Sequence, residues 1–272
     1  LGDVYKRQKQ AYRTAKILNF DITVFAPKGR GEAGTLEMVH FLKKVLEERY
    51  DGICISPIAD LRVEKLLQKM AEKGVEVIFI LSAFDSVPYR TLIGTDSYQC
   101  GRSTGEAVRE ALGADGAVGI IKWKDNLIET VEDRYHGVVD VLKENRIPYY
   151  DMTGPGEPTA EEATKLTDRL LTEHPDISVL CATNVGWGLA FARYLKSKGK
   201  KVKLVTVDFT DEVGEFMKAG YVDAAIAQRP ESWGSMTLEK IEAVFEGQSI
   251  PKTIDTGTYP VTPANIRIYV KD

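Results

Sequence analysis

Residues 203–230 read KLVTVDFTDEVGEFMKAGYVDAAIAQRP and hold two short apolar runs on either side of an amphipathic segment. Leu204–Val207 is rich in β-branched residues, has the length of a buried strand and stops at Asp208. Val222–Ala227 predicts a second strand, which stops at Gln228 two positions before a proline that cannot continue central pairing. Each predicted strand therefore ends on a polar side chain.

The segment between these strands predicts a helix. Thr210 is a suitable N-cap, Glu212 lies in the first turn, and Gly220 follows the last turn. A strand, a helix and a second strand form a unit of parallel sheet, and open parallel sheets bind ligands at the carboxyl ends of their strands. We therefore expect a small-molecule site around Asp208 and Gln228.

Outward from this stretch, strand and helix signals alternate along the chain about every 25–30 residues, as expected for βαβ crossovers and an α/β fold. The predicted strands are Ile22–Phe25, Gly52–Ser56, Val77–Leu81, Leu92–Thr95, Ala117–Ile121, Tyr149–Met152, Ser178–Ala182, Leu204–Val207 and Val222–Ala227. The predicted helices are Leu36–Arg49, Leu61–Lys73, Gly101–Leu112, Ile128–Glu144, Ala160–Thr172, Gly186–Ser197, Asp211–Ala219 and Ser232–Phe245. The proline-broken, β-rich tail 250–272 is expected on the surface.

The start of the chain departs from this alternation. Residues 4–18 have helical spacing, whereas a doubly wound domain begins with a strand. The first eight residues, LGDVYKRQ, have no methionine and resemble a truncated or foreign start. We expect the first strand, and any export signal before it, to be absent from this sequence.

Composition narrows the function. The chain has 272 residues, long enough for two domains, a net charge of −4 and no long basic run, which disfavours direct binding of duplex nucleic acid. Cys54 and Cys181 lie in apolar strands and are expected to be buried, whereas Cys100 is expected to be more exposed. The histidines are scattered, so we expect no metal site and no cofactor.

One glycine motif needs weighing. Residues 29–34 read GRGEAG, which matches the dinucleotide-binding pattern G-x-G-x-x-G. Ala26-Pro27-Lys28 separates this motif from the preceding strand, so the tight strand-to-glycine turn is missing. The spacing favours a plain loop over a nucleotide site.

Other polar or aromatic residues follow predicted strands. Asn184 can cap the next helix or bind a ligand hydroxyl, and Trp123 can stack on a flat ligand face. Arg134 lies near the start of a helix, where a buried arginine has to pair with the protein or with a ligand. Asp96, with Gly101 and Gly105, predicts helix capping and close helix packing, or else the lining of a crossover between lobes.

Several short words, in order along the chain, resemble the type I periplasmic sugar-binding family, above all the ribose-binding-like solute receptors. The matching words are Gly52-Ile53-Cys54-Ile55-Ser56-Pro57, Ile93-Gly94-Thr95-Asp96, Arg134-Tyr135-His136-Gly137, Ala182-Thr183-Asn184, Val207-Asp208, Ala225-Ile226-Ala227-Gln228 and Val261-Thr262. The resemblance implies two Rossmann-like α/β lobes joined by a three-strand hinge, with ligand held between them. It places one lobe at residues 1–97 and 229–256 and the other at 98–228 and 257–272.

The resemblance also implies a binding site. Asn184, Asp208 and Gln228 stand where the family hydrogen-bonds sugar hydroxyls, with aromatic packing expected from Trp123 or Trp187. Ribose-type receptors carry an Asp-Arg pair where this chain has Leu81-Ser82. Ser82 is therefore the candidate ligand-binding residue at this position, with fewer hydrogen-bonding groups than the Asp-Arg pair.

A second departure concerns charge. The ligand-binding arginine of the family aligns with Glu132, while Arg134 matches a second, more structural arginine. Glu132 and Asp125 then favour a ligand with a cationic or donor-rich group, such as an amino sugar.

The leading function is a solute receptor of an ABC-type uptake system, periplasmic or an extracellular lipoprotein, monomeric, with a sugar-like ligand and a membrane permease as partners. The alternatives are the ligand-sensing domain of a membrane sensor or of a lactose-repressor-type regulator. An enzyme is disfavoured, because the sequence has no nucleophile elbow, phosphate-binding loop or metal-ligand cluster, although Asp125 and Asp208 could be imagined as a glycosidase pair.

Overall fold

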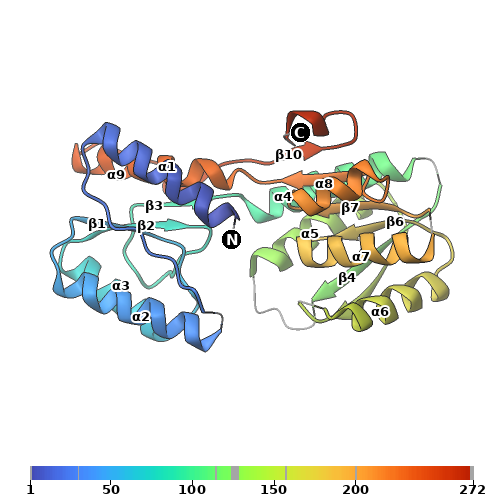
Figure 1. Cartoon of the computed structure of the whole chain (residues 1–272), viewed down its shortest axis with the longest axis horizontal. Coiled ribbons are helices and arrows are strands. Elements are labelled where there is room, and N and C mark those ends of the chain that lie inside the picture. The colour runs from blue at the N-terminus through green and yellow to red at the C-terminus, as the bar shows by residue number, and fades with distance from the viewer. Residues whose placement is uncertain are drawn as a thin grey trace. The chain divides into compact units, whose positions relative to one another are not determined.

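The computed structural model describes residues 2–29, 31–113, 115–123, 129–156, 158–199 and 201–269. The chain divides into two compact units (Figure 1). Unit 1 comprises residues 1–95 and 229–256, and unit 2 comprises residues 96–228 and 257–272. Each unit is an α/β layer structure with its own sheet.

Unit 1 has a four-stranded sheet in the order β1-β2-β3-β9, with all pairs parallel. Its elements are α1 (Gly2–Leu18), α2 (Glu32–Glu47), β1 (Gly52–Ile55), α3 (Leu61–Glu72), β2 (Glu76–Ile80), β3 (Thr91–Gly94), α9 (Pro230–Phe245) and β9 (Thr253–Asp255). Alternation along β2 sends Val77 and Phe79 into the core under α2 and α3, and Ile78 into the core under α1 and α9. Figure 1 shows these helix pairs on opposite sides of the sheet.

Unit 2 has a six-stranded sheet in the order β10-β8-β7-β6-β4-β5, parallel except where β10 pairs with β8. Its elements are α4 (Ser97–Leu112), β4 (Ala117–Trp123), α5 (Glu129–Glu144), β5 (Tyr149–Gly154), α6 (Ala160–Glu173), β6 (Ile177–Ala182), α7 (Val185–Lys198), β7 (Lys203–Val207), α8 (Asp211–Lys218), β8 (Ala224–Ala227), β10 (Tyr259–Val261) and the 3₁₀ turn η1 (Ile266–Ile268).

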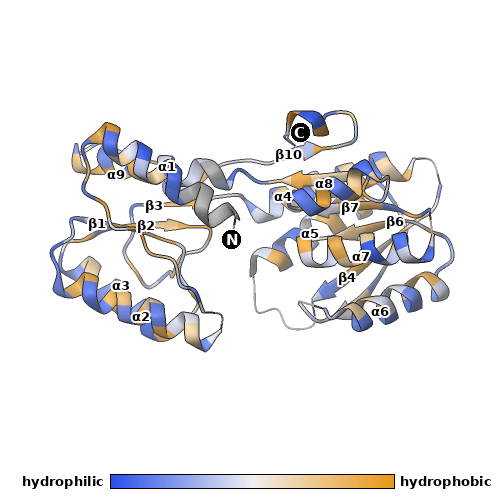
Figure 2. Cartoon of the chain, viewed as in Figure 1, coloured by the Kyte–Doolittle hydropathy of each residue, from blue (hydrophilic) through white to orange (hydrophobic). Residues whose placement is uncertain are grey.

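The central strands of unit 2 are buried on both faces. Leu204 packs on the α6, α7 and α8 side, whereas the next residue, Val205, packs on the α4 and α5 side. A strand covered by helices on both faces reads as a continuous apolar run. Figure 2 shows that α7, by contrast, carries both hydrophobic and hydrophilic colours.

The strand predicted at Ile22–Phe25 is absent: these residues form no strand in the structure. They alternate between exposed and half-buried, and Phe25 stacks on Phe41 with ring centroids 4.3 Å apart. The pattern of a strand is thus present, but no neighbouring strand among the described residues supplies the ladder of hydrogen bonds. The alternation of exposed and half-buried residues was predicted correctly and the strand wrongly.

The helix caps agree better with the sequence. The Thr210 side chain accepts a hydrogen bond from the Val213 N–H at the start of α8, as predicted. Asp96 caps α4 in the same way through the Gln99 N–H. The helix begins at Ser97 rather than Gly101, because the cap lies one turn earlier than the apolar spacing indicated.

The thiols are mostly inaccessible. Cys181 is fully buried, and burial raises its pKa to about 12, so it acts as a small core residue. Cys100, expected to be more exposed, is also fully buried. Cys54 is half-buried in β1 and contacts the Thr237 carbonyl through its sulfur.

The loop that enters the glycine motif is bonded to Glu37 of α2. The backbone N–H groups of Lys28 and Gly29 donate to the Glu37 carboxylate at 2.7 and 3.2 Å. A phosphate would need the same donors. These bonds stabilise the loop that leads into α2, in agreement with the interpretation of the motif as a plain loop and not a nucleotide site.

Helices α4 and α5 approach each other through glycines. A Cβ on Gly137 would lie 2.2 Å from the Tyr98 carbonyl oxygen, and one on Gly101 would lie 2.2 Å from the Arg134 carbonyl oxygen. These contacts are with backbone, which cannot rotate away. The packing predicted from Gly101 is therefore present, and it fixes the backbone of α5 at Arg134.

Replacing Gly137 with alanine should lower the free energy of unfolding by about 1–3 kcal/mol, because the new methyl group forces α4 and α5 apart. In an exposed helix the same change would stabilise by about 1 kcal/mol, so the sign tests the packing. Urea denaturation followed by circular dichroism measures it. Glu110→Ala, at an exposed position of α4, is the control and should change stability by less than about 0.5 kcal/mol. Equal stability of G137A and wild type would contradict the close approach.

Candidate ligand-binding edge of unit 2

Four polar or aromatic residues lie at or just beyond the carboxyl ends of neighbouring strands in unit 2. They are Trp123 at the end of β4, Asn184 after β6, Asp208 after β7 and Gln228 after β8. The strands β8, β7, β6 and β4 are consecutive in the sheet and parallel. Their carboxyl ends therefore share one edge, here called the polar edge, which is where such sheets bind ligands.

Asp208 is held by an unusual backbone. Its φ of 69° lies in the left-handed region, which aspartate tolerates better than most residues. The Asp208 N–H still donates to the Ile226 carbonyl at 2.9 Å, so the ladder between β7 and β8 ends at this residue. The chain then turns away from the sheet with the carboxylate half-buried at the polar edge.

Gln228 is oriented by Asp208. Its Nε2 donates to the Asp208 Oδ1 at 2.7 Å. A carboxylate only accepts, so the amide nitrogen must face Asp208 and the amide oxygen must face away. That oxygen, Gln228 Oε1, is buried and has no hydrogen-bond partner among the described residues.

Asn184 performs the capping role considered for it, and its amide nitrogen stays available for the other role. Its Oδ1 accepts the Trp187 N–H at 3.0 Å and caps α7. The cap fixes the orientation of the amide and leaves Nδ2 buried without a partner in the described part of the chain. A cap and a ligand donor are thus compatible in one side chain.

Arg134 is a buried cation that contacts the backbone just before Asn184. Only 8% of the residue is exposed, and Nη1 makes a long contact of 3.4 Å with the carbonyl oxygen of Thr183, the residue before Asn184. The Arg134 Nε has no partner in the described residues. A structural partner was expected for Arg134, and the Thr183 carbonyl is the one the described residues provide. No carboxylate of the described residues pairs with the guanidinium.

The unpartnered atoms gather at the polar edge. Buried side-chain atoms without a partner, over the described residues, belong to Thr91, Trp123, Arg134, Asn184 and Gln228. All but Thr91 are residues that the sequence singled out. Each such atom costs about 1–3 kcal/mol unless something bonds to it. A ligand that fills these positions would remove the cost.

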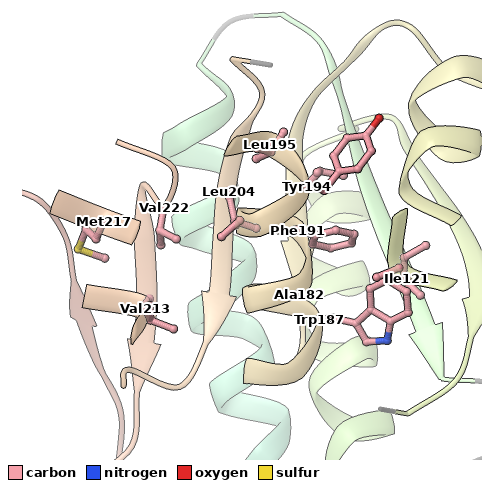
Figure 3. Close-up of a cluster of buried hydrophobic side chains, with 14 of the residues drawn as sticks. Ile121, Ala182, Trp187, Phe191, Tyr194, Leu195, Leu204, Val213, Met217 and Val222 are labelled. Carbon is pink, nitrogen blue, oxygen red and sulfur yellow. The ribbon is translucent and has the colours of Figure 1, made fainter. Parts of the chain in front are cut away.

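The position of Trp187 differs from the one predicted. The ring was expected to pack on a ligand, but it has no exposed surface and lies in the core with Phe191 (Figure 3). Its indole N–H donates to the Pro155 carbonyl at 2.9 Å. Of the two candidate aromatic residues, only Trp123 has exposed surface at the polar edge.

Trp123 has a neighbour that the sequence did not reveal. A Cβ on Gly156 would lie 3.1 Å from the indole ring, so the ring lies close against the backbone of the loop after β5. The indole Nε1 has no partner among the described residues. The Gly-Pro-Gly run at 154–156 was the available signal for this close approach.

Glu132 is paired within the protein. Its Oε1 lies 2.9 Å from Lys122 Nζ and 3.2 Å from His136 Nε2, and the side chain is largely buried. The carboxylate proposed to attract a cationic ligand is thus already neutralised by Lys122. The other proposed carboxylate, Asp125, lies outside the described residues.

Ser82 is not part of the polar edge. It follows β2 in unit 1 and is exposed. The preceding residue, Leu81, has a φ of 69° and donates its N–H to Ile93, as Asp208 does to Ile226 in unit 2. Leu81 is therefore the counterpart of Asp208 in the other sheet.

Over the described residues, no group of three or more His, Cys, Asp or Glu side chains could hold a metal ion. The helices in the same part of the chain are too short or too polar to cross a membrane.

Comparison with known proteins identifies the family. A family model for the periplasmic binding protein domain matches residues 6–249. The chain belongs to this family. The ribose import binding protein of Bacillus subtilis (strain 168) is 21% identical over 220 residues, which cover 78% of this chain and 69% of that protein.

Solved structures share the fold. An arabinose-binding protein from Geobacillus stearothermophilus superposes with a TM-score of 0.87 at 21% identity, over 100% of this chain and 96% of the other. A putative LacI transcriptional regulator from Bacteroides fragilis superposes with a TM-score of 0.77 at 19% identity, over 98% and 95%. The predicted α/β fold and family are confirmed, and the family of binding proteins agrees with the prediction that the chain is not an enzyme.

Two substitutions at Asn184 separate its cap from its amide donor. Asn184→Asp keeps an oxygen that accepts the Trp187 N–H and adds a favourable charge at the helix start, so the unfolding midpoint should stay close to wild type. Asn184→Ala removes the cap and should cost about 1 kcal/mol. Thermal unfolding of the ligand-free protein measures both, and equal loss in the two variants would contradict the capping role.

Proposed function

We propose that the chain is a solute-binding receptor of an ABC-type uptake system and that it binds a small saccharide-like ligand. The observation that carries the proposal is the polar edge of unit 2, where buried hydrogen-bonding atoms of Trp123, Arg134, Asn184 and Gln228 have no protein partner in the described residues. A ligand rich in oxygen atoms satisfies such groups. The names of the curated relatives support the same class, because they are ribose import binding proteins.

The chemistry of the edge suits polyols. Asp208 accepts hydroxyl protons, Asn184 donates through Nδ2, and Gln228 accepts through Oε1. The half-buried ring of Trp123 offers an apolar face of the kind that packs on the C–H face of a sugar. These are residue roles that we propose for the ligand-bound protein.

The receptor acts in the periplasm, or outside the cell as a lipoprotein, as a monomer that delivers its ligand to a membrane permease. Closure of two lobes by a hinge remains part of this proposal. The fold alone also suits a ligand-sensing domain of a membrane sensor or of a lactose-repressor-type regulator. The import binding proteins among the curated relatives favour uptake.

Thermal unfolding in the presence of pentoses, hexoses, amino sugars, sugar acids, polyols and autoinducer-type furanoses tests the function. A ligand at 100 times its dissociation constant adds about 2.7 kcal/mol of stability, which raises the midpoint clearly. We expect at least one saccharide-like compound to do so. A well-folded sample that responds to none of them would contradict the proposal.

Asp208→Asn then tests the site. Asparagine tolerates the left-handed backbone and keeps the size of the side chain, so the ligand-free protein should remain stable. The affinity for the ligand found in the panel should fall at least tenfold, because the charged acceptor is lost. Isothermal titration calorimetry measures the change.

Asp223→Asn is the matched control. Asp223 accepts the Leu204 N–H at 2.9 Å and lies at the opposite, amino-terminal edge of the same sheet. This variant should bind as wild type does. Equal affinities of the Asp208 and Asp223 variants would remove the polar edge from the binding site.

A further inference from the structure

The buried guanidinium of Arg134 has no counter-ion among the described residues. Three acidic side chains on its own helix have other partners: Glu132 pairs with Lys122, Asp140 accepts from Tyr98, and Glu144 pairs with Arg102. Asp133 forms no ion pair with any described cation. The neighbouring helix α4 also leaves Arg134 unpaired, since Glu106 pairs with Arg109.

Among the described residues, Asp208 is a further charged group at the polar edge. Its Oδ1 accepts from Gln228, and it forms no ion pair with Arg134. A buried cation without a paired anion is strongly unfavourable, and a bound anion would compensate it. No described residue supplies that anion.

The unpartnered atoms point to the same conclusion. Three of them are donors, Trp123 Nε1, Arg134 Nε and Asn184 Nδ2, and one is an acceptor, Gln228 Oε1. A ligand hydroxyl brings a proton that needs its own acceptor, whereas a carboxylate only accepts. Asp208 and Gln228 Oε1 can accept protons from ligand hydroxyls, whereas the three donors at the edge that Arg134 contacts suit a carboxylate.

We propose that the ligand is a sugar acid, an aldonate or uronate, whose carboxylate pairs with Arg134 while its hydroxyl groups bind Asn184, Asp208 and Gln228. The inference rests on the proposed function and specifies its ligand class. From Glu132 the sequence suggested a ligand with a cationic group, whereas we now propose an anionic ligand. Lys122 already pairs with Glu132, so Glu132 no longer favours a cation.

Calorimetry with matched pairs tests the inference on the whole chain. The pairs are D-galacturonate and D-galactose, D-glucuronate and D-glucose, and D-arabinonate and D-arabinose. In at least one pair the acid should bind at least tenfold more tightly than the neutral sugar. The acid removes both the buried charge and the unpaired donors, whereas the neutral sugar leaves the guanidinium without an anion.

Arg134→Met assigns the preference to the guanidinium. The tenfold preference for the acid should disappear in this variant. The midpoint of the ligand-free protein should be unchanged or higher, because an apolar side chain replaces an uncompensated buried charge. An arginine with a purely structural role would show the opposite, a lower midpoint with the preference retained.

Lys143→Gln removes a positive charge from an exposed position of the same helix and should leave the preference intact. Neutral sugars that bind as tightly as their acids, in wild type and R134M alike, would overturn the inference and leave the sugar-receptor function standing. Failure of both classes to bind would overturn the proposed function and the inference with it.

Discussion

The parallel pairing of β4, β6, β7 and β8 is the constraint on which the rest of the site depends. Parallel strands place all their carboxyl ends at one edge of the sheet. Residues that follow separate strands, from Trp123 to Gln228, therefore gather although about a hundred positions separate them in sequence. The apolar interior of each strand anchors its polar end, since Leu204 and Val205 lie buried on opposite faces just before Asp208.

The polar edge retains groups that folding alone does not satisfy. The caps and hydrogen bonds of the protein orient Asn184 and Gln228 and use one half of each amide. The other halves remain buried and unbonded among the described residues. Pre-oriented groups of this kind lose little entropy when a ligand binds, which favours affinity. The glycine contacts between α4 and α5 extend this order to the backbone of Arg134.

Much of this was predictable from local sequence. Strand ends at Asp208 and Gln228, the Thr210 cap and the glycine packing of α4 all follow from residue type and spacing. The absence of a strand at Ile22–Phe25 was not predictable, because a strand requires a partner strand that periodicity cannot reveal. The pairing of Glu132 with Lys122 was also invisible, since the two residues belong to different elements. Trp187 misled because a tryptophan near a strand end serves a core as readily as a ligand.

The polar edge of unit 2 is the ligand site that we propose. The indole N–H signals of the three tryptophans in a ¹H–¹⁵N spectrum test it directly, with the saccharide or sugar acid that stabilises the protein as titrant. The Trp123 N–H has no partner among the described residues, whereas those of Trp187 and Trp233 donate to Pro155 and Thr256. We expect saturation to move the Trp123 and Arg134 Nε signals and to leave the Trp187 signal in place. A saturated protein in which neither the Trp123 nor the Arg134 signal moves would rule out the polar edge as the ligand site.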